Sequence, residues 1–298
     1  MNRLQADLLL LLTAFIWGTA FVAQKYANDS MPPITIVGAR FLISALALLP
    51  FMLYEAKRAT APLRRIDWIQ ALIVGLCLCT GSCLQQTGLL TTSATNGGFL
   101  TALYVVIVPF MFWAISGQKP RALVLVACGV SIYGAWLLAD DGQAQHWRLG
   151  DILMVVSDFA WALAITLIAV FLQRSHRPFF LSFMQYAVTT ALALPAGFLF
   201  ESPTVAGTVS GLLPLLYIGL ISGGLAYTFG VLAQKHTPPA EAALIMCLES
   251  VFAALAGAVL LHERLTLPAT LGCALILLGV VLVETGPLLL RKLGITAT

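Results

Sequence analysis

Ten apolar runs, each roughly 20 residues long, follow one another along the chain and constrain its fold more than any other feature. A helix needs about 20 mostly apolar residues to cross a bilayer. The runs occupy residues 6–26, 33–54, 67–87, 93–115, 121–139, 150–172, 178–199, 211–233, 238–261 and 267–287. The chain is 60% hydrophobic and 10% charged, whereas soluble domains carry about 25% charged residues. We therefore predict an all-α integral membrane protein with ten transmembrane helices.

Lysine and arginine residues are distributed unevenly between the segments on the two sides of the membrane. If the N-terminus is cytoplasmic, twelve of them lie in cytoplasmic segments, three (Lys25, Arg148 and Arg264) lie outside, and Arg40 lies within a span. Because cytoplasmic loops carry the excess of these residues, both termini are predicted to be cytoplasmic in a bacterial-type inner membrane. The net charge of +3 is dispersed and forms no basic stripe, so no nucleic-acid partner is expected.

The two halves of the chain match each other in a nearly constant register. A shift of 144 residues pairs the start of the first run with the start of the sixth. A shift of 145 residues pairs identical residues further along the two halves. The pairs are Asp7 and Asp151, Phe15 and Phe159, Trp17 and Trp161, then Pro33 and Pro178, Pro50 and Pro195, Thr92 and Thr237, and Gly134 and Gly279. Five spans per copy is an odd number, so we predict two inverted repeats, residues 1–144 and 145–298. Such repeats are typical of transporters that work by alternating access, with the binding site near the midplane.

Three stretches carry a resemblance to a known family. "LTAFIWGTAFVAQK", "TTSATNGGFLTALYVVIVP" and "CLESVFAALAGAVLLHERLT" resemble the drug/metabolite transporter superfamily, EamA type, and the overall pattern is similar to the YddG-type amino-acid exporters. The resemblance covers the whole chain and implies a ten-helix exporter of amino acids and other small metabolites. Two positions depart from the family pattern. The second copy has the family's glutamate, Glu263, whereas the first copy reads "SGQKP" at the corresponding place. In the ninth span, Glu249-Ser250 stands where the family usually has a Glu-Pro pair.

Three ionisable side chains, Arg40, Asp158 and Glu249, lie deep within the predicted spans. Each costs about 2.5 to 3.5 kcal/mol to insert, which marks it as a functional candidate. Glu249 is about eleven residues from either end of its span, at the midplane, and is either a substrate anchor or a protonated acid bonded to a neighbouring helix. Arg40 and Asp158 enter from the same predicted side at ~10–12 Å depth. If their faces meet, they form an ion pair that is a static strut, part of an outer gate, or a contact for a substrate carboxylate.

Aromatic and polar side chains complete the candidate substrate site. Trp17 and Trp161 occupy equivalent positions well inside their spans, which favours either the walls of a central cavity or ordinary packing. Aromatic residues that belong to the interfacial belt lie nearer the span ends. The further candidates are Tyr104 (the repeat partner of Glu249), Asn96, Gln85 and Tyr227.

Motifs for catalysis and metal binding are missing from the sequence. It contains no HExxH, no P-loop and no Ser/His/Asp set, and its six cysteines lie in apolar runs as small hydrophobic residues. We expect no enzyme activity, cofactor or metal. The leading hypothesis is a secondary transporter that exports amino acids or similar small metabolites. The first alternative is a lipid or lipid-linked sugar flippase, and the second is a membrane-embedded enzyme. The expected partners are a small-molecule substrate and membrane lipids, and the expected assembly is a monomer.

Overall fold

The computed structural model of the chain describes residues 1–139, 148–262 and 266–292. Within them every regular element is a helix, as predicted for an all-α membrane protein. Eight segments are long and apolar enough to cross a membrane, and two shorter apolar helices span Ala122–Leu137 and Leu267–Val283. The ten-span count and the cytoplasmic termini stay predictions. Glu263, Arg264 and the predicted boundary between the repeats lie outside the described residues.

Some predicted spans are single helices and others are divided. The single ones are α1 (Arg3–Asn28), α2 (Pro33–Arg58), α3 (Arg65–Gly88), α6 (Ala122–Ala139), α7 (Leu149–Arg174), α8 (Pro178–Phe200) and α14 (Leu267–Lys292). The fourth span comprises α4 (Ala94–Thr101) and α5 (Tyr104–Ser116), and the ninth comprises α12 (Pro239–Met246) and α13 (Glu249–Leu260). The eighth comprises α10 (Leu212–Leu216), the π-helix η1 (Tyr217–Ala226) and α11 (Tyr227–Gln234), after the short helix α9 (Val205–Ser210).

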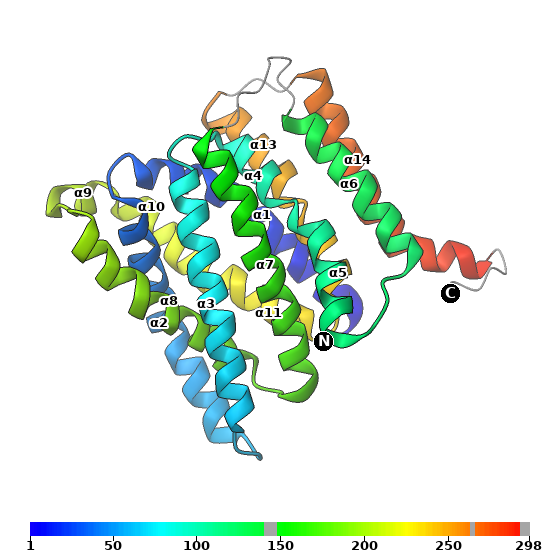
Figure 1. Ribbon diagram of the computed structural model, residues 1–298, viewed down its shortest axis with the longest axis horizontal. Coiled ribbons are helices and arrows are strands. Elements are labelled where there is room, and N and C mark those ends of the chain that lie inside the picture. Colours follow the sequence, from blue (N-terminus) through cyan, green and yellow to red (C-terminus); the bar gives the residue numbers. More distant parts are fainter. Residues whose placement is uncertain (140–147, 263–265, 293–298) are drawn as a thin grey trace.

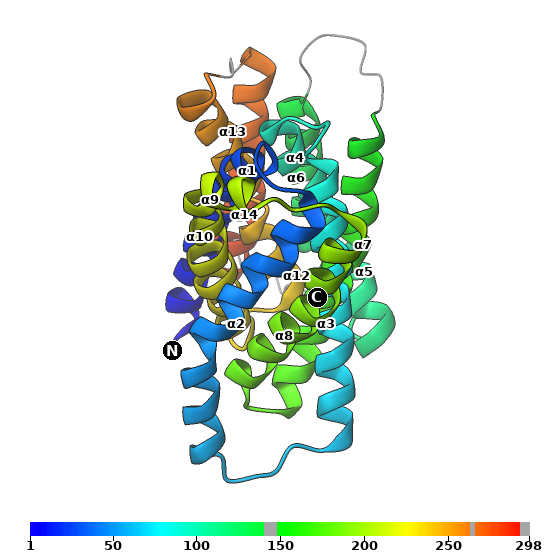
Figure 2. The same ribbon diagram turned by 90° about the vertical axis from the view of Figure 1, so that its left-hand side faces the viewer.

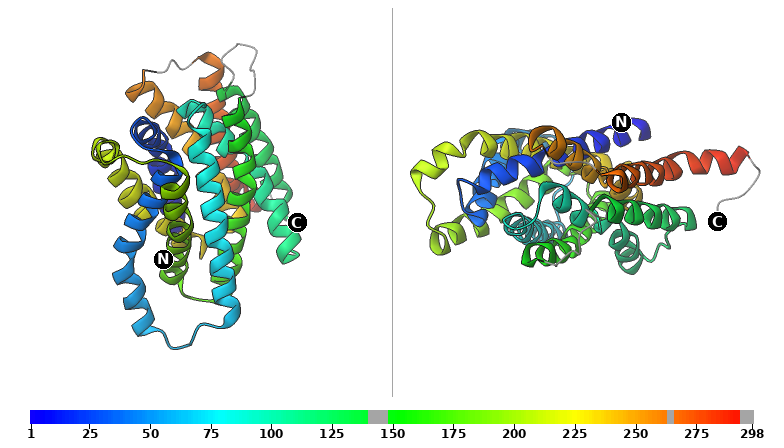
Figure 3. Two further views of the ribbon diagram at one scale, coloured as in Figure 1. Left: turned by 60° about the vertical axis from the view of Figure 1, so that its left-hand side comes forward. Right: turned by 90° about the horizontal axis from the view of Figure 1, so that it is seen from above.

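Helices from the two halves of the chain pack against each other throughout the bundle. The most extensive contacts join α2 to α8, α6 to α14, α3 to α7 and α1 to α13. Figure 1 shows α6 and α14 side by side at one edge and α2 and α8 towards the other. Figure 2 shows the long helices running between the two ends of the bundle, and the view from above in Figure 3 shows that α14 extends beyond it. Neither half therefore forms a core alone.

The helix pair α2 and α8 is closed at each end by a glutamate from the partner helix. The first backbone N–H groups of a helix have no acceptor within it. Glu201, just after α8, accepts hydrogen bonds from the backbone nitrogens of Ile34 (3.0 Å) and Thr35 (2.8 Å) at the start of α2. Glu55, near the end of α2, accepts from the nitrogens of Phe179 (3.0 Å) and Phe180 (2.9 Å) at the start of α8. The two helices are therefore antiparallel and cap each other reciprocally.

Glycines allow α13 to lie against both α1 and α4. A Cβ atom added to Gly18 of α1 would lie 2.5 Å from the Cβ of Phe252 and 2.7 Å from the carbonyl oxygen of Glu249. One added to Gly98 of α4 would lie 2.7 Å from the Cβ of Ala253. Small residues permit such close approach of membrane helices. The start of α13, including Glu249, is thereby fixed between α1 and α4.

Candidate functional site

A cavity lies at the centre of the bundle and is lined by helices of both halves. About 700 Å³ within its bounds is not filled by atoms, and part of that space is open to solvent. The polar and aromatic side chains that line it are Trp17, Phe21, Gln24, Arg40, Gln85, Thr101, Tyr104, Trp161, Gln185, Ser222, Tyr227, Gln234 and Glu249. Most of the predicted substrate-site residues therefore lie around one space.

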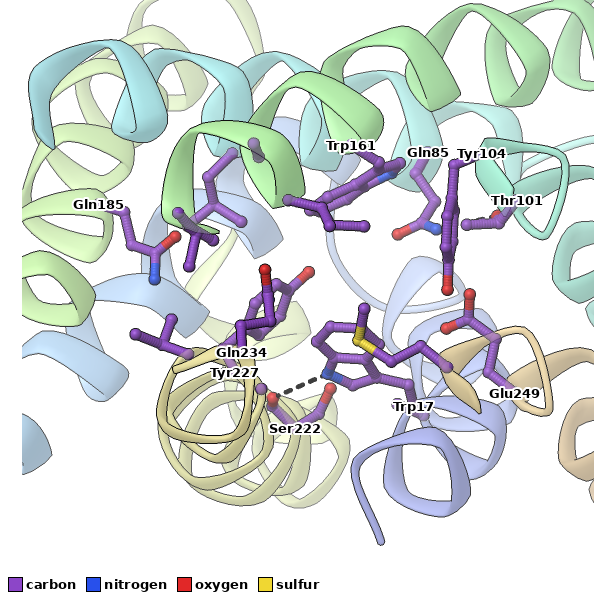
Figure 4. Close-up of a pocket in the computed structure, with 18 of the residues that line it drawn as sticks. Trp17, Gln85, Thr101, Tyr104, Trp161, Gln185, Ser222, Tyr227, Gln234 and Glu249 are labelled. Carbon is purple, nitrogen blue, oxygen red and sulfur yellow. Dashed lines mark hydrogen bonds between the residues drawn. The ribbon is translucent and has the colours of Figure 1, made fainter. Parts of the chain in front are cut away.

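Two helix interruptions place Tyr104 and Glu249 beside each other. At each break, backbone hydrogen bonds span three residues instead of four. The Leu103 nitrogen donates to the Leu100 oxygen, and the Leu248 nitrogen donates to the Ile245 oxygen. Tyr104 and Glu249 are the first residues of α5 and α13, and the two breaks are related by the shift of 145 residues. Figure 4 shows the Tyr104 hydroxyl pointing at the Glu249 carboxylate. Stretches of 3₁₀ helix within longer helices often mark functional hinges.

Three aromatic rings form a continuous wall of the cavity. The ring centroid of Tyr227 lies 4.5 Å from that of Trp17 and 6.0 Å from that of Trp161. The Trp17 indole nitrogen donates to the carbonyl oxygen of Ser222 (3.3 Å), which lies in the π-helical segment (Figure 4). Gly81 of α3 leaves room for Trp161, since a Cβ there would be 3.0 Å from its indole ring. The rings offer a flat apolar surface to a ligand.

Arg40 supplies a cation in the wall of the same cavity. Its side chain is 3% exposed, and its Nη1 atom donates to the Oε1 atom of Gln24 (2.9 Å). Its Nε and Nη2 atoms have no hydrogen-bond partner among the described residues. A buried guanidinium with free donors is suited to a planar anion such as a carboxylate.

The predicted ion pair between Arg40 and Asp158 is absent. Arg40 donates to Gln24, while Asp158 of α7 is fully buried, does not line the cavity, and has no hydrogen-bond partner for either oxygen among the described residues. The sequence predicts a similar depth for the two residues, but depth does not determine which helix face a side chain occupies.

Asn96, a predicted site residue, does not line the cavity. It lies in the first turn of α4, half-buried, and its backbone nitrogen donates to the Ser93 hydroxyl (3.0 Å), which caps that helix. A polar side chain close to a helix start is more readily part of the cap than of a midplane site.

Five polar residues of the cavity were missed by sequence reasoning as site residues: Gln24, Thr101, Gln185, Ser222 and Gln234. Gln185 is the repeat partner of Arg40, and this relation was the available signal for it. Thr101 accepts a hydrogen bond from Gln85 (3.0 Å). Glutamine and threonine are common on buried helix faces, so the type of residue alone does not distinguish a cavity from a packed interface.

Many of the polar atoms in the cavity have no hydrogen-bond partner within the described part of the chain. Besides two nitrogens of Arg40, they are the Tyr104 hydroxyl, the Trp161 indole nitrogen, Gln185 Nε2, Gln234 Oε1 and Glu249 Oε1. Because most buried polar groups in proteins are hydrogen-bonded, these atoms are available to bind water or a polar ligand. The lining therefore provides donors, acceptors, a cation and a carboxyl group.

Polar contacts tie the two halves together at both ends of the bundle. At the N-terminal face, where α1 begins, Thr237 donates to Asp7 (2.9 Å) and Arg3 pairs with Glu241 (2.6 Å). At the opposite face the symmetry-related Thr92 donates to Asp151 (2.7 Å). There the ammonium of Lys25 also donates to the carbonyl oxygen of Thr92 (2.6 Å), next to the end of α1. We name these contacts the N-terminal clasp (Arg3, Asp7, Thr237, Glu241) and the opposite clasp (Lys25, Thr92, Asp151).

A second hollow opens at the N-terminal face. It is lined mainly by α7, α11 and the segment that joins α11 to α12, including Gln173, Lys235 and His236. Gln234 lines both this hollow and the central cavity. The Gln234 side chain therefore lies between the two spaces.

These features define a multi-pass membrane protein with a polar cavity between two halves of similar sequence pattern. The model of the EamA-like transporter family matches residues 4–139 and 148–285, and the chain belongs to that family. This confirms the predicted placement in the drug/metabolite transporter superfamily and identifies the protein as a transporter.

Relatives and a solved structure agree with this placement. The chain is 31% identical to an uncharacterized transporter of Archaeoglobus fulgidus, over 95% of this chain and 87% of that protein. It is 24% identical to a probable amino-acid metabolite efflux pump of Escherichia coli (strain K12), over 91% of this chain and 92% of the pump. A crystal structure matches with a TM-score of 0.77 at 17% identity, over 94% of this chain and 97% of that one, and so shares the fold.

Proposed function

We propose that this protein exports amino acids or similar small metabolites across the inner membrane as a secondary transporter that works by alternating access. One observation carries the substrate class: Arg40 and Glu249, a cation and a carboxyl group, line one cavity together with the rings of Trp17, Tyr227 and Trp161. A zwitterion with an apolar side chain matches this lining. The printed name of the Escherichia coli relative, an amino-acid metabolite efflux pump, supports the same class.

Each end of the zwitterion has a suitable group in this arrangement. The substrate carboxylate accepts from the free guanidinium nitrogens of Arg40, and the ammonium lies against the Glu249 carboxylate. An apolar or aromatic side chain contacts the aromatic wall, where each ring contact contributes about 0.5–1.5 kcal/mol. Aspartate and glutamate are poorer substrates because their second carboxylate has no further cation among the described lining residues.

Alternating access needs a closed contact at each face that can be released in turn. The N-terminal clasp and the opposite clasp meet this need, since each joins residues of one half to residues of the other. Their pairing by the shifts of 144 and 145 residues supports two inverted repeats. The predominance of Lys and Arg on the N-terminal side supports the cytoplasmic placement of that face.

The test is counterflow in proteoliposomes with three matched competitors. Phenylalanine carries both charges, phenethylamine lacks the carboxylate, and phenylpropionate lacks the ammonium. Arg40→Gln should weaken inhibition by phenylalanine and phenylpropionate but not by phenethylamine, and Glu249→Gln should weaken phenylalanine and phenethylamine but not phenylpropionate. Each lost contact is worth ~1–3 kcal/mol, or roughly five- to 150-fold in affinity.

Arg58→Gln is the matched control, since this exposed arginine lies outside the cavity, over the Tyr54 ring. It should leave all three inhibition constants unchanged. A panel in which no amino acid supports counterflow, or in which glutamate and phenylalanine are transported equally, would contradict the proposed substrate class.

A further inference from the structure

Four helix ends meet at one corner of the bundle, where α2 and α7 end and α3 and α8 begin. Figure 1 and Figure 2 show the segment that joins α2 to α3 and the segment that joins α7 to α8 at the same end of the bundle. The Trp68 ring of α3 lies 4.9 Å from the Phe180 ring of α8, and Glu55 of α2 accepts from the Phe180 nitrogen (2.9 Å). The Arg174 guanidinium of α7 donates to the side-chain oxygen of Gln70 in α3. Direct contacts therefore join all four ends.

This corner carries an excess of positive charge. Residues 51–70 and 167–184, which include the four ends, contain six Lys or Arg and two Asp or Glu side chains, an excess of four positive charges. We name the six cations the basic corner: Lys57, Arg58, Arg64, Arg65, Arg174 and Arg177. All are exposed except Arg177, which is half-buried. A surface with one dominant sign of charge attracts ligands of the opposite sign.

The two carboxylates of the corner are already engaged. Glu55 accepts hydrogen bonds from the backbone nitrogens of Phe179 (3.0 Å) and Phe180 (2.9 Å) at the start of α8. Asp67 is buried, accepts from the backbone nitrogen of Arg64 (2.8 Å), and lies 3.8 Å from the Nε atom of the same residue. Neither carboxylate therefore neutralises the other cations of the basic corner.

Arg177 supplies hydrogen-bond donors that the described part of the chain does not use. Its side chain is 15% exposed, and its Nε and Nη1 atoms are buried without a hydrogen-bond partner among the described residues. The Nε atom lies 3.9 Å from the Glu55 carboxylate, which is an ion-pair contact but too long for a hydrogen bond. Buried polar groups are normally hydrogen-bonded, and a guanidinium binds phosphate through paired N–H donors. Arg177 is therefore suited to a phosphate group.

Aromatic side chains place the basic corner at the membrane interface. Tyr54 near the end of α2 is 56% exposed, and Trp68 near the start of α3 is 49% exposed. The guanidinium carbon of Arg58 lies 4.6 Å from the centroid of the Tyr54 ring. Both helices are long and apolar enough to cross a membrane. Because exposed Trp and Tyr at the ends of such helices lie at headgroup level, the basic corner has lipid headgroups beside it.

We propose that the basic corner binds the headgroup of an anionic phospholipid, with Arg177 as the specific contact to its phosphate. Basic pockets between the ends of transmembrane helices suit such headgroups. The exposed cations strengthen binding through charge, by roughly fivefold for each Lys or Arg. The ligand comes from the surrounding bilayer, where its acyl chains remain. Because α2 and α3 belong to the first half of the chain and α7 and α8 to the second, one bound lipid contacts both halves.

The experiment measures thermal unfolding of the full-length protein in a neutral detergent while a short-chain lipid is added. Dioctanoyl phosphatidylglycerol should raise the unfolding midpoint to a plateau. Dioctanoyl phosphatidylcholine has the same acyl chains but no net charge, and glycerol 1-phosphate has an anionic headgroup but no chains, so neither should raise it at the same concentration. Added NaCl should weaken the response to phosphatidylglycerol, because salt screens exposed charges.

Variants of the basic corner separate specific binding from general surface charge. Arg177→Gln should weaken the apparent affinity for phosphatidylglycerol at least fivefold. The double variant Lys57→Gln with Arg65→Gln changes two exposed side chains, so it should leave the midpoint without lipid unchanged and weaken affinity about fivefold for each charge removed. Lys119→Gln is the matched control, because Lys119 is also exposed and beside an aromatic ring, that of Trp113, but lies outside the basic corner. It should respond as the wild type does.

Four results would overturn the proposal. An equal response to phosphatidylcholine would show that the acyl chains alone are bound, and an equal response to glycerol 1-phosphate would show a site for soluble anions. Unchanged affinity in the double variant and in Arg177→Gln would exclude the basic corner. An equal loss in Lys119→Gln would show that any surface cation suffices. If Arg177→Gln does not fold, the double variant alone decides between binding at the basic corner and its absence.

Discussion

The hydroxyl of Thr237 donates a hydrogen bond to the carboxylate of Asp7 across 2.9 Å and so joins the segment before α12 to the first helix of the chain. The same contact recurs at the opposite face, where Thr92 donates to Asp151 at 2.7 Å. The residues of the second contact are those that the sequence register pairs with the first. Each contact thus connects one half of the chain to the other, at opposite ends of the bundle.

The two clasps predict opposite effects of the same substitution. Thr237→Val removes the bond to Asp7 and should favour states that are open at the N-terminal face, while Thr92→Val should favour states open at the opposite face. A hydrogen bond to a charged group is worth ~1.5–3 kcal/mol, enough to change a labelling rate about tenfold or more. Thiol labelling of Val231→Cys and Ala20→Cys, two cavity positions at different depths, measures this in a cysteine-free background.

Val231→Cys, near the N-terminal face, should react faster in Thr237→Val, and Ala20→Cys should react faster in Thr92→Val. Val231 lies three residues before the end of α11, and Ala20 lies in the second half of α1. If both threonine variants change the same probe in the same direction, the clasps do not act as alternating contacts.

The aromatic wall predicts a selective loss with bulky substrates. Trp17→Ala removes the ring that contacts Tyr227 at 4.5 Å, so transport of phenylalanine and leucine should fall more than transport of alanine. Trp17→Phe keeps a ring and should retain most of the activity. Counterflow at matched protein density provides the comparison, and an equal loss for alanine and phenylalanine would indicate a structural role for Trp17.

Close packing around Glu249 predicts a stability difference between two glycine substitutions. Gly18→Ala places a Cβ atom 2.5 Å from that of Phe252, so α1 and α13 must separate, at a typical cost of ~1–3 kcal/mol. Gly129→Ala in α6 is the control, because a Cβ there meets nothing within 4 Å. Thermal unfolding in detergent should show a lower midpoint for Gly18→Ala only. Equal midpoints would show that the helices adjust at no cost.

The orientation predicted from the charge count is tested by labelling from one side. Cysteines at Asp29 and Ser202 should react with a membrane-impermeant reagent added outside intact cells, in a cysteine-free background. Cysteines at Lys57 and Lys119 should react only after permeabilisation. All four positions are exposed, so a failure to react reports the side of the membrane and not burial. Labelling of Lys57 and Asp29 from the same side would reject the predicted topology.

The sequence predicted the helical architecture and much of the cavity because both depend on patterns that a single chain displays. Apolar run length determines which segments can span a bilayer, and midplane depth selected Trp17, Trp161 and Glu249, all of which line the cavity. The shift of 145 residues also identified Tyr104 as the partner of Glu249. These inferences require only the position of each residue along its predicted span.

What the sequence could not predict depends on contacts between helices. The sequence predicts similar depths for Arg40 and Asp158, but Arg40 donates to Gln24 and the two side chains form no ion pair. The short 3₁₀ turns next to Tyr104 and Glu249 contain no glycine or proline to signal them. The π-helix that contains Ser222 was not predicted either.

The reciprocal caps of α2 and α8 have a consequence for how the protein opens. Glu201 lies just past the end of α8 but satisfies donors at the start of α2, and Glu55 of α2 does the same for α8. Fraying at either end of the pair therefore exposes unpaired amides on the other helix. In hydrogen-exchange terms, the first turn of each helix depends on the last turn of its partner, so removing Glu201 should accelerate deuterium exchange of the first amides of α2 and removing Glu55 that of the first amides of α8.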